Sequence, residues 1–364
     1  MTKGMEGGPV TLIRSAAVFY ESLFPSLRNA RQSVRSQIYL IEEGPLADEL
    51  KNILVSLAKR GIRVDLIYDS VGCMNVSSLY FEEMEAEGVN VMEYNPVNPS
   101  RVPGQFSIRR LFRRNHRKVF VIDSIKYYLG GMNIGERFYD WEDVMAAGEG
   151  WPAQELCESF DRTWSGKKYA WGKKATPRKE RLRNPIQVWD GRPAFENYPI
   201  KRLYLSAIKK SREKVWIAQA YFIPRRRLMK ALIHAAGKGV DVRVVVPDFS
   251  DVALTDAAGW PALTRLIKHG VKVYRFEPGM LHSKMALIDG DWVTVGTANL
   301  DSMSLYWNLE INLVARRGIL VKEAEELFAG YFAQSREISL EEAQARPLTL
   351  KLAGWLLNYF AWIL

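Results

Sequence analysis

The segment Ala58-Lys-Arg-Gly-Ile-Arg-Val-Asp-Leu-Ile-Tyr-Asp69 returns later in the chain as Ala236-Gly-Lys-Gly-Val-Asp-Val-Arg-Val-Val-Val-Pro-Asp248. Each copy predicts the end of a helix, a glycine that stops it and a buried strand. A second pair, Glu87-Gly-Val-Asn-Val91 and His269-Gly-Val-Lys-Val273, repeats the order of glycine-closed helix and strand. Repetition on this scale indicates that the chain is built from two related units.

Alternation of helix and strand in both units predicts an α/β fold. We expect two similar lobes, each a mixed β-sheet flanked by helices. A pseudo-two-fold axis would relate them and place equivalent surfaces, with the active site, between them. The predicted boundaries are 1–164 for the first lobe, 165–186 for a linker, 187–340 for the second lobe and 341–364 for a C-terminal apolar helix. The linker is predicted from eight Lys or Arg residues against one acid between Ser165 and Pro185.

The composition narrows the class of protein. With 364 residues and 48% hydrophobic content the chain can bury a sizeable core, and its charge of +10 favours an anionic partner, either nucleic acid or acidic lipid. Cys73 and Cys157 lie in no disulfide or zinc-binding pattern, which is typical of a reduced, cytosol-facing protein. Residues 1–10 do not look like a signal peptide, and no run of about 18 apolar residues predicts a spanning helix.

Two short motifs share one spacing. The first is His116-Arg-Lys-Val-Phe-Val-Ile-Asp123, followed by Gly130-Gly-Met-Asn133, and the second is His282-Ser-Lys-Met-Ala-Leu-Ile-Asp289, followed by Gly296-Thr-Ala-Asn299. The chain has only four histidines, and both of these have Lys at +2, Asp at +7 and Asn at +17. Chance agreement of this kind is on the order of one in 100,000, so the motifs indicate function.

The residue types suit phosphodiester chemistry. Residues i and i+2 of a strand share a face, so each motif presents His and Lys side by side. Attack at phosphorus needs a nucleophile, an acid for the departing alkoxide and fixed groups around the anionic oxygens. Because the pKa of imidazole is near 6.5, we expect one ring to be neutral and the other protonated at the same pH. Two ammonium groups can hold the phosphate, so no metal or cofactor is predicted.

The paired motifs, their glycine- and asparagine-containing followers and the duplication resemble the phospholipase D superfamily across nearly the whole chain. Within it, the chain is most similar to bacterial cardiolipin synthases that lack paired N-terminal membrane helices. The residues that carry this likeness are Asn115 to Lys118, Gly130 to Gly135, Trp141, Asp143, Asn299 to Ser302 and Asn308 to Glu310. Two positions depart from it, since Glu142 and Met303 stand where arginine is common, and they leave the exact lipid and acceptor open.

The resemblance implies a double displacement through a phosphohistidine. It assigns His116 as nucleophile and His282 as acid and base, although the reverse assignment stays open. The implied catalytic set is His116, Lys118, Asp123, His282, Lys284 and Asp289, with Asn133, Asn299, Asp143, Glu310 and Ser302 around the phosphate. Asp143 and Glu310 lie 27 and 28 residues after the motif histidines, where the family places a carboxylate that orients an imidazole. Asp123 and Asp289, at the strand ends, are expected to organise the motif.

The first unit carries 16 extra residues just before its histidine. Within them, 101–114 is acid-free and mixes five arginines with apolar side chains, which favours contact with lipid phosphates and acyl chains over a solvated basic loop. The residues predicted to touch lipid here are Arg109, Arg110, Leu111, Phe112, Arg113 and Arg114. At the C-terminus, Trp355 and Trp362 favour a helix lying in the headgroup region, with docking on the protein core or a second subunit as the alternative.

Together these features predict a cardiolipin synthase-like phosphatidyltransferase. It would move a phosphatidyl group from phosphatidylglycerol to the alcohol of another phospholipid and release glycerol. Hydrolysis of phospholipid to phosphatidic acid is the first alternative and a nuclease the second. Phosphatidylglycerol, cardiolipin and the membrane surface are the expected partners, nucleic acid is disfavoured, and monomer and homodimer stay open. The expected location is peripheral, on the cytoplasmic face of the bacterial cell membrane.

Overall fold

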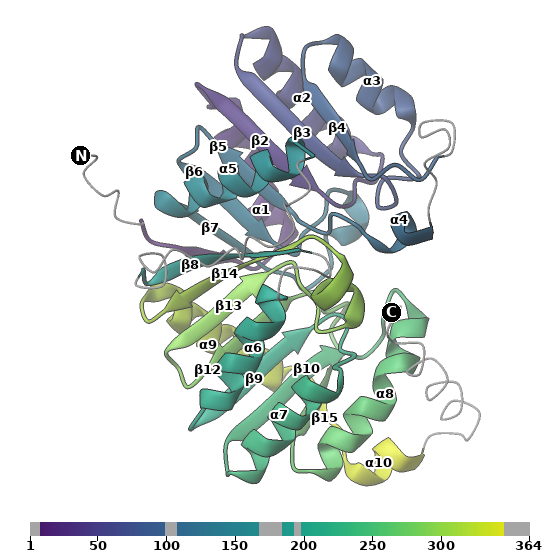
Figure 1. Ribbon diagram of the computed structural model, residues 1–364, viewed down its shortest axis with the longest axis vertical. Helices are drawn as coiled ribbons and strands as arrows, with labels where there is room; N and C mark the ends of the chain where they lie inside the picture. The colour runs from purple at the N-terminus through teal and green to yellow at the C-terminus, as the bar shows by residue number, and fades with distance from the viewer. Residues whose placement is uncertain (1–7, 99–107, 167–183, 193–197, 346–364) are drawn as a thin grey trace.

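The computed structural model describes residues 8–98, 108–166, 184–192 and 198–345, which form two lobes stacked along the long axis (Figure 1). Each lobe contains one mixed β-sheet with helices packed against it, so the predicted α/β fold is confirmed. Most of the predicted linker and of the C-terminal helix, 167–183 and 346–364, lies outside the described residues, and their boundaries stay predictions.

The first sheet has seven strands in the order β1-β7-β6-β5-β2-β3-β4. Its strands are β1 (Thr11–Ile13), β2 (Ser33–Ile38), β3 (Arg63–Asp69), β4 (Asn90–Tyr94), β5 (Val119–Ile122), β6 (Lys126–Gly130) and β7 (Met145–Glu149). The strands β2, β3 and β4 run parallel, and every other pair is antiparallel.

The second sheet has eight strands, and from its β8 edge the order is β8-β14-β13-β12-β9-β10-β11-β15. They are β8 (Ile186–Gly191), β9 (Lys214–Gln219), β10 (Asp241–Pro247), β11 (Lys272–Phe276), β12 (Lys284–Ile288), β13 (Trp292–Gly296), β14 (Glu310–Arg316) and β15 (Ser335–Glu337). Strand for strand this is the order of the first sheet with β15 added, and the parallel strands β9, β10 and β11 correspond to β2, β3 and β4. The duplication read from the sequence is therefore a duplication of topology.

The helices follow the same repeat. In the first lobe they are α1 (Ala16–Arg28), α2 (Pro45–Lys59), α3 (Ser78–Ala86), the short α4 (Ile108–Phe112) and α5 (Trp151–Trp164). In the second they are α6 (Pro199–Lys210), α7 (Arg226–Gly237), α8 (Ala253–Lys268), α9 (Ile319–Ala333) and α10 (Leu340–Ala345). None of the described helices is long and apolar enough to cross a membrane.

The repeated glycines end helices as predicted. Gly61 and Gly239 have φ of +78° and +85°, a left-handed conformation in which glycine has no Cβ penalty. The N–H of each glycine donates to a carbonyl of the last helical turn, of Ala58 at 2.9 Å and of Ala236 at 2.9 Å. The chain then turns directly into the buried strand β3 or β10.

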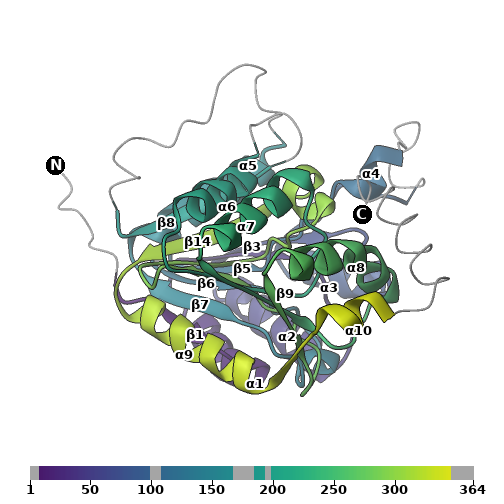
Figure 2. The same cartoon turned by 90° about the horizontal axis from the view of Figure 1, so that it is seen from below.

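The inner faces of the two sheets pack on each other. One cluster of buried apolar side chains draws on both lobes, including Val121 and Leu129 from the first and Leu287 and Val295 from the second. Strands β6 and β7 contact β13 and β14, while α5 contacts β8 and α9 contacts β1 across the boundary. Figure 2 shows α9 and α1 on one side of the layered sheets and α5, α6 and α7 on the other. The motif-bearing strands are thereby fixed relative to each other.

Candidate active site

Each motif histidine is anchored by the backbone of the opposite lobe. His116 immediately precedes the buried segment that becomes β5, and its N–H donates to the carbonyl of Leu309 at 3.0 Å. His282 precedes β12, and its N–H donates to the carbonyl of Glu142 at 2.8 Å. The two contacts are equivalent under the pseudo-two-fold relation, so both histidines lie where the lobes meet.

The carboxylates that orient the imidazoles are exchanged between the lobes. His116 Nδ1 lies 3.0 Å from Glu310 Oε1, and His282 Nδ1 lies 2.6 Å from Asp143 Oδ2. A carboxylate at this position accepts a hydrogen bond from Nδ1–H, so Nε2 is the nitrogen without a proton when the ring is neutral. The spacing identified Asp143 and Glu310, and the structure adds that each serves the histidine of the other motif.

The residues that follow each motif shape the space around these carboxylates. A Cβ at Gly131 would lie 2.2 Å from Asp143 Oδ1, so only glycine fits beside that carboxylate. At the equivalent position, the Thr297 hydroxyl donates to Glu310, and the Thr297 carbonyl lies 3.1 Å from His116 Nδ1. The Gly-Gly and Gly-Thr sequences therefore differ because the shorter Asp and the longer Glu are accommodated differently.

The two lysines are fully buried beside the histidines. Lys118 Nζ donates to the His116 carbonyl at 3.0 Å and lies 4.6 Å from the centre of the Tyr39 ring. Lys284 Nζ donates to the carbonyl of His282. Burial lowers the pKa of Lys284 to about 8, and burial together with the charge of Lys284 lowers the pKa of Lys118. The charge of Lys284 also acts on His116 and that of Lys118 on His282, so the two motifs lie in one site.

Both imidazoles favour the neutral form. Burial, assisted by the charge of Lys284, lowers the pKa of His282 to about 4. Burial also lowers the pKa of His116, and it outweighs the opposite effect of Glu310. The direction of both shifts runs against the expectation of one neutral and one protonated ring, because desolvation acts on both histidines alike.

Aromatic rings line the histidines. The Tyr39 ring meets His116 edge-on at a centroid distance of 4.6 Å. Trp141 and Tyr221 lie 5.0 Å and 6.3 Å from the His282 ring. These walls limit the access of water to the imidazoles.

Sequence reasoning singled out Trp141 but missed both tyrosines. They follow β2 and β9, in the matching triplets Gln37-Ile-Tyr39 and Gln219-Ala-Tyr221. A full comparison of the two repeats would have flagged this shared Gln-x-Tyr pattern.

Several predicted phosphate-binding groups are buried with unused polar atoms. The side-chain oxygens of Asn133, Asn299 and Ser302 have no hydrogen-bond partner within the described structure, which is typical of a site that binds a polar ligand. Asp301, which sequence reasoning did not assign, lies next to Ser302, and its carboxylate accepts the N–H of Ser304 at 2.7 Å. Burial raises the pKa of Asp301 to about 7, so a proton is readily held there.

Asp123 and Asp289 lie at the opposite ends of β5 and β12 from the histidines. The Asp123 carboxylate accepts backbone N–H groups of residues 31–33, and the Asp289 carboxylate those of residues 212–214. These contacts organise the strands and keep both carboxylates away from the reacting atoms. The contacts agree with the expectation that Asp123 and Asp289 organise the motif, and they do not support a place for either carboxylate in the catalytic set.

The prediction that Arg114 contacts lipid is wrong. Its side chain is buried and pairs with Asp69 at 3.0 Å, because β3 ends beside it. Leu111, in contrast, is exposed, and Arg110, Phe112 and Arg113 are half-buried. The side chains of Arg109, Trp355 and Trp362 lie outside the described residues.

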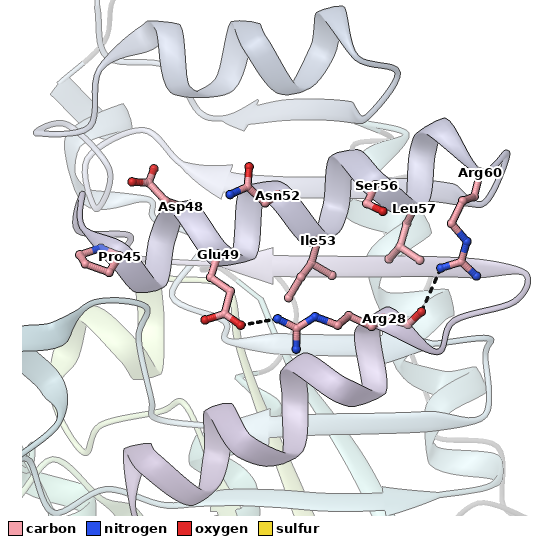
Figure 3. Close-up of a pocket in the computed structure, with 9 residues that line it drawn as sticks. All are labelled: Arg28, Pro45, Asp48, Glu49, Asn52, Ile53, Ser56, Leu57 and Arg60. Carbon is pink, nitrogen blue, oxygen red and sulfur yellow. Dashed lines mark hydrogen bonds and ion pairs between the residues drawn. The ribbon is translucent and has the colours of Figure 1, made fainter.

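A surface depression of about 990 Å³, open solvent included, lies between α1 and α2 (Figure 3). Its lining is an ordinary helix–helix surface in which Arg28 pairs with Glu49 and Arg60 donates to the Arg28 carbonyl at 3.0 Å. No motif residue lines it. The paired histidines, not this depression, define the active site.

Comparison with known proteins identifies the family of the chain. The family described as "Cardiolipin synthase, PLD-like domain" matches residues 23–164 and 204–332, which make up most of the chain. The cardiolipin synthase of Geobacillus kaustophilus (strain HTA426) is 30% identical over 363 residues, covering 95% of this chain and 71% of the relative. Cardiolipin synthase A of Yersinia pseudotuberculosis serotype O:1b (strain IP 31758) is 31% identical over 376 residues, covering 98% and 76%.

Solved structures show the same fold. The crystal structure of phosphatidylserine synthase from Haemophilus influenzae Rd KW20 superposes with a TM-score of 0.78 at 13% identity, covering 100% of this chain and 98% of that one. Polyphosphate kinase from Porphyromonas gingivalis gives a TM-score of 0.64 at 12% identity, covering 96% and 52%. The chain belongs to the cardiolipin synthase family of phospholipase D-like proteins, and it is a phosphatidyltransferase of the phospholipase D type.

Proposed function

We propose that the chain transfers a phosphatidyl group from phosphatidylglycerol to the hydroxyl of a second phospholipid through a phosphohistidine. The observation that carries this proposal is the crossed arrangement of the site. Two buried imidazoles, each contacted by a carboxylate of the other lobe, lie beside two buried lysines. Such a site offers a nucleophile and a proton carrier on opposite sides of one phosphate.

In the first step, His116 Nε2 attacks phosphorus, and the bond from phosphorus to the oxygen of the headgroup glycerol breaks, which leaves the phosphatidyl group on the histidine. Glu310 at Nδ1 stabilises the positive charge that develops on the ring. The departing alkoxide takes a proton from His282, which gains that proton when the anionic phosphate enters and raises the pKa of the ring. Lys118 and Lys284 balance the charge on the phosphoryl oxygens.

In the second step, the acceptor hydroxyl loses its proton to His282 and its oxygen attacks phosphorus. The bond from phosphorus to His116 Nε2 breaks, and the neutral imidazole is restored. Water in place of the alcohol would yield phosphatidic acid. Burial of the histidines and the aromatic walls favour transfer, because they restrict water at the intermediate.

The deciding experiment incubates the full chain with phosphatidylglycerol vesicles and identifies the products. We expect cardiolipin and glycerol in equal amounts, and neither from the His116→Asn or His282→Asn variants. His234→Asn, on the exposed face of α7, is the matched control and should keep full activity. Phosphatidic acid as the main product would replace transfer with hydrolysis, and cleavage of DNA at a comparable rate would favour a nuclease.

A second experiment distinguishes the roles of the two histidines. It uses a donor whose leaving group departs without help from an acid. With phosphatidyl-p-nitrophenol, the His282→Asn variant should release nitrophenol once and retain a phosphatidyl group on His116, which mass spectrometry detects. The His116→Asn variant should form no adduct. An adduct on His282 would exchange the two roles.

We also propose that the chain works at the surface of an anionic membrane. Leu111 on α4 is 40% exposed, and Phe249, Val252 and Leu254 before and within α8 are 57%, 42% and 51% exposed. The helices α4 and α8 lie on the same side of the molecule (Figures 1 and 2). Exposed apolar side chains from both lobes on one side suit shallow insertion into a bilayer.

Vesicle flotation tests this surface. The double variant Leu111→Asp, Phe249→Asp should lose flotation with phosphatidylglycerol vesicles. The matched control is Ile125→Asp, which changes an equally exposed apolar residue in the β5–β6 turn, at the far end of β5 from His116. Equal flotation of all three proteins would contradict the membrane surface. Deletion of residues 347–364 measures separately what the C-terminus contributes.

A further inference from the structure

A group of cations gathers where α6 and α7 begin. Lys201 Nζ lies 4.2 Å from the centre of the Tyr198 ring and 4.5 Å from that of Tyr306. The guanidinium carbon of Arg225 lies 4.9 Å from the same Tyr306 ring. Arg227 adds a third charge close enough to act on Lys201. We call Lys201, Arg225 and Arg227 the Lys201 cluster.

Among the described residues, the Lys201 cluster has no acidic partner. Within the described residues, none of its three cations forms an ion pair, whereas other arginines of this lobe do, such as Arg192 with Asp190 at 2.8 Å and Arg275 with Asp256 at 2.6 Å. Partial burial and the charges of Arg227 and Arg225 lower the pKa of Lys201, which reports mutual repulsion. Repelling cations held on the faces of aromatic rings form a ready site for an anion.

The cluster lies beside the active site. Tyr306 belongs to the π-helix Met303–Trp307, which directly follows Asp301 and Ser302. Arg225 comes four residues after Tyr221, whose ring contacts His282, and four residues span at most about 14 Å. The helices α6 and α7 pack side by side on the second sheet (Figure 1). The cluster therefore lies on elements that lead directly into the active site, through Tyr221 on one side and Ser302 on the other.

The equivalent place in the first lobe has the opposite charge. There Glu42 and Glu43 precede α2, and the Glu136 carboxylate accepts the N–H of Leu46 in the first turn of that helix. The positive charge there, Arg137, pairs with Glu42 at 3.7 Å, so among the described residues of these two places the unpaired cations belong to the lobe of His282. This histidine is the one that handles the acceptor hydroxyl in the proposed mechanism.

We propose that the Lys201 cluster binds the phosphodiester of the acceptor phospholipid, the phosphate that the reaction leaves intact. The inference rests on the proposed function and extends it to the second substrate. The product carries two phosphates joined by a single glycerol, so the acceptor phosphate stays near the reacting one throughout. An alcohol without a phosphate gains nothing from the cluster.

The ratio of two products tests this. Phosphatidylglycerol vesicles are supplied with ethanol, so that the phosphohistidine partitions between phosphatidylglycerol, giving cardiolipin, and ethanol, giving phosphatidylethanol. Donor binding, vesicle binding and enzyme concentration cancel in the ratio, because both products arise from one intermediate. Loss of a charge-assisted contact should lower the ratio of cardiolipin to phosphatidylethanol about tenfold in Lys201→Gln or Arg225→Gln, and further in the double variant.

Arg226→Gln is the matched control, since Arg226 is exposed on the same helix and contributes to no contact of the cluster, and its ratio should equal that of the wild type. Arg225→Lys should recover part of the ratio by restoring the charge. Equal loss of both products would assign the cluster to general lipid binding and overturn the inference, as would an unchanged ratio. A wild-type chain that forms neither product overturns the proposed function and this inference with it.

Discussion

At the scale of single residues, the site holds charged side chains in buried positions, which lowers the stability of the fold. Lys284 is fully buried, and its pKa of about 8 means that burial opposes the ammonium form at neutral pH. We expect Lys284→Met to abolish transfer and yet to raise the free energy of unfolding, by up to about 3 kcal/mol at pH 7. Thermal and urea unfolding of the two proteins measure this gain.

The gain in stability of Lys284→Met over the wild type should become smaller as the pH rises. Between pH 8 and about 10.5 the unfolded lysine still binds a proton that the folded one has lost, so the wild type gains stability and the difference from Lys284→Met shrinks. Lys230→Met, on the exposed face of α7, controls for the change of side chain. A variant less stable than the wild type at pH 7 would show that the contact with the His282 carbonyl outweighs the burial of charge.

His282 should make the protein sensitive to acid. Its pKa is about 4 in the fold against an ordinary value of 6.5, so the neutral ring contributes stability that is complete above pH 6.5 and lost as pH falls toward 4. That loss is on the order of 3 kcal/mol. Between pH 6.5 and 4, the free energy of unfolding measured with urea should therefore fall more for the wild type than for His282→Gln.

The control for this measurement is His269→Gln, which removes an exposed histidine at the end of α8 and should retain the acid sensitivity of the wild type. If His282→Gln and the wild type lose stability in parallel, the imidazole is not the titrating group.

Sequence spacing predicted the residues of the site better than their partnerships. The identities of His116, His282, Asp143 and Glu310 follow from a repeated motif, which is a local signal. The pairing of His116 with Glu310 spans 194 residues and that of His282 with Asp143 spans 139. Such contacts depend on how the sheets pack, and periodicity holds no information about that.

At the scale of elements, the Asp in the turn after each motif strand binds the backbone at the start of the neighbouring strand, β2 or β9. Asp123 and Asp289 have φ of +54° and +52°, which asparagine also tolerates, so Asp→Asn removes mainly the charge-assisted acceptors. We expect Asp123→Asn and Asp289→Asn each to lower the free energy of unfolding by about 1–3 kcal/mol. Transfer per folded molecule should remain, since neither carboxylate reaches the histidines.

Asp291→Asn changes an exposed carboxylate in the same turn as Asp289 and serves as the control, with little expected change in stability. Loss of activity in folded Asp123→Asn, measured where circular dichroism shows an intact fold, would return that carboxylate to the catalytic group.

The sequence predicted the elements well where their signals are local. Glycines at 61 and 239 end α2 and α7, and apolar runs form β3 and β10. The error at Arg114 has the opposite origin. Its composition favoured a lipid-facing loop, but Asp69 at the end of β3, 45 residues away, neutralises it inside the protein. A buried ion pair between distant elements leaves no trace in local composition.

At the scale of the whole molecule, the two lobes are interdependent. The repeat predicted two similar units about a pseudo-two-fold axis, and the strand orders agree with it. Which sheet faces pack together was not predictable, because strands such as β5 and β12 are buried on both sides and show no alternation. The shared core and the crossed carboxylates both result from that packing.

This interdependence can be tested by dividing the chain within 167–183, outside the described residues. Each half alone should be inactive, because each histidine lacks its carboxylate and its backbone anchor, and should aggregate through an exposed apolar sheet face. Burying each aliphatic side chain of that face contributes about 1.5–3 kcal/mol, which also drives the halves together. Co-expressed halves should therefore regain transfer, measured as cardiolipin formed from phosphatidylglycerol.

Because each histidine pairs with a carboxylate of the other lobe, variants of the two halves should affect the activity of the assembled enzyme in a specific pattern. A first half carrying Asp143→Asn should impair the histidine of the second half, and a second half carrying Glu310→Gln that of the first, so either change alone disables the assembled enzyme. With phosphatidyl-p-nitrophenol as donor, the assembly with Asp143→Asn should still form the adduct on His116, whereas the assembly with Glu310→Gln should form it slowly. The opposite pattern would mean that each carboxylate serves the histidine of its own lobe, and the exchange between lobes that holds the site together would be refuted.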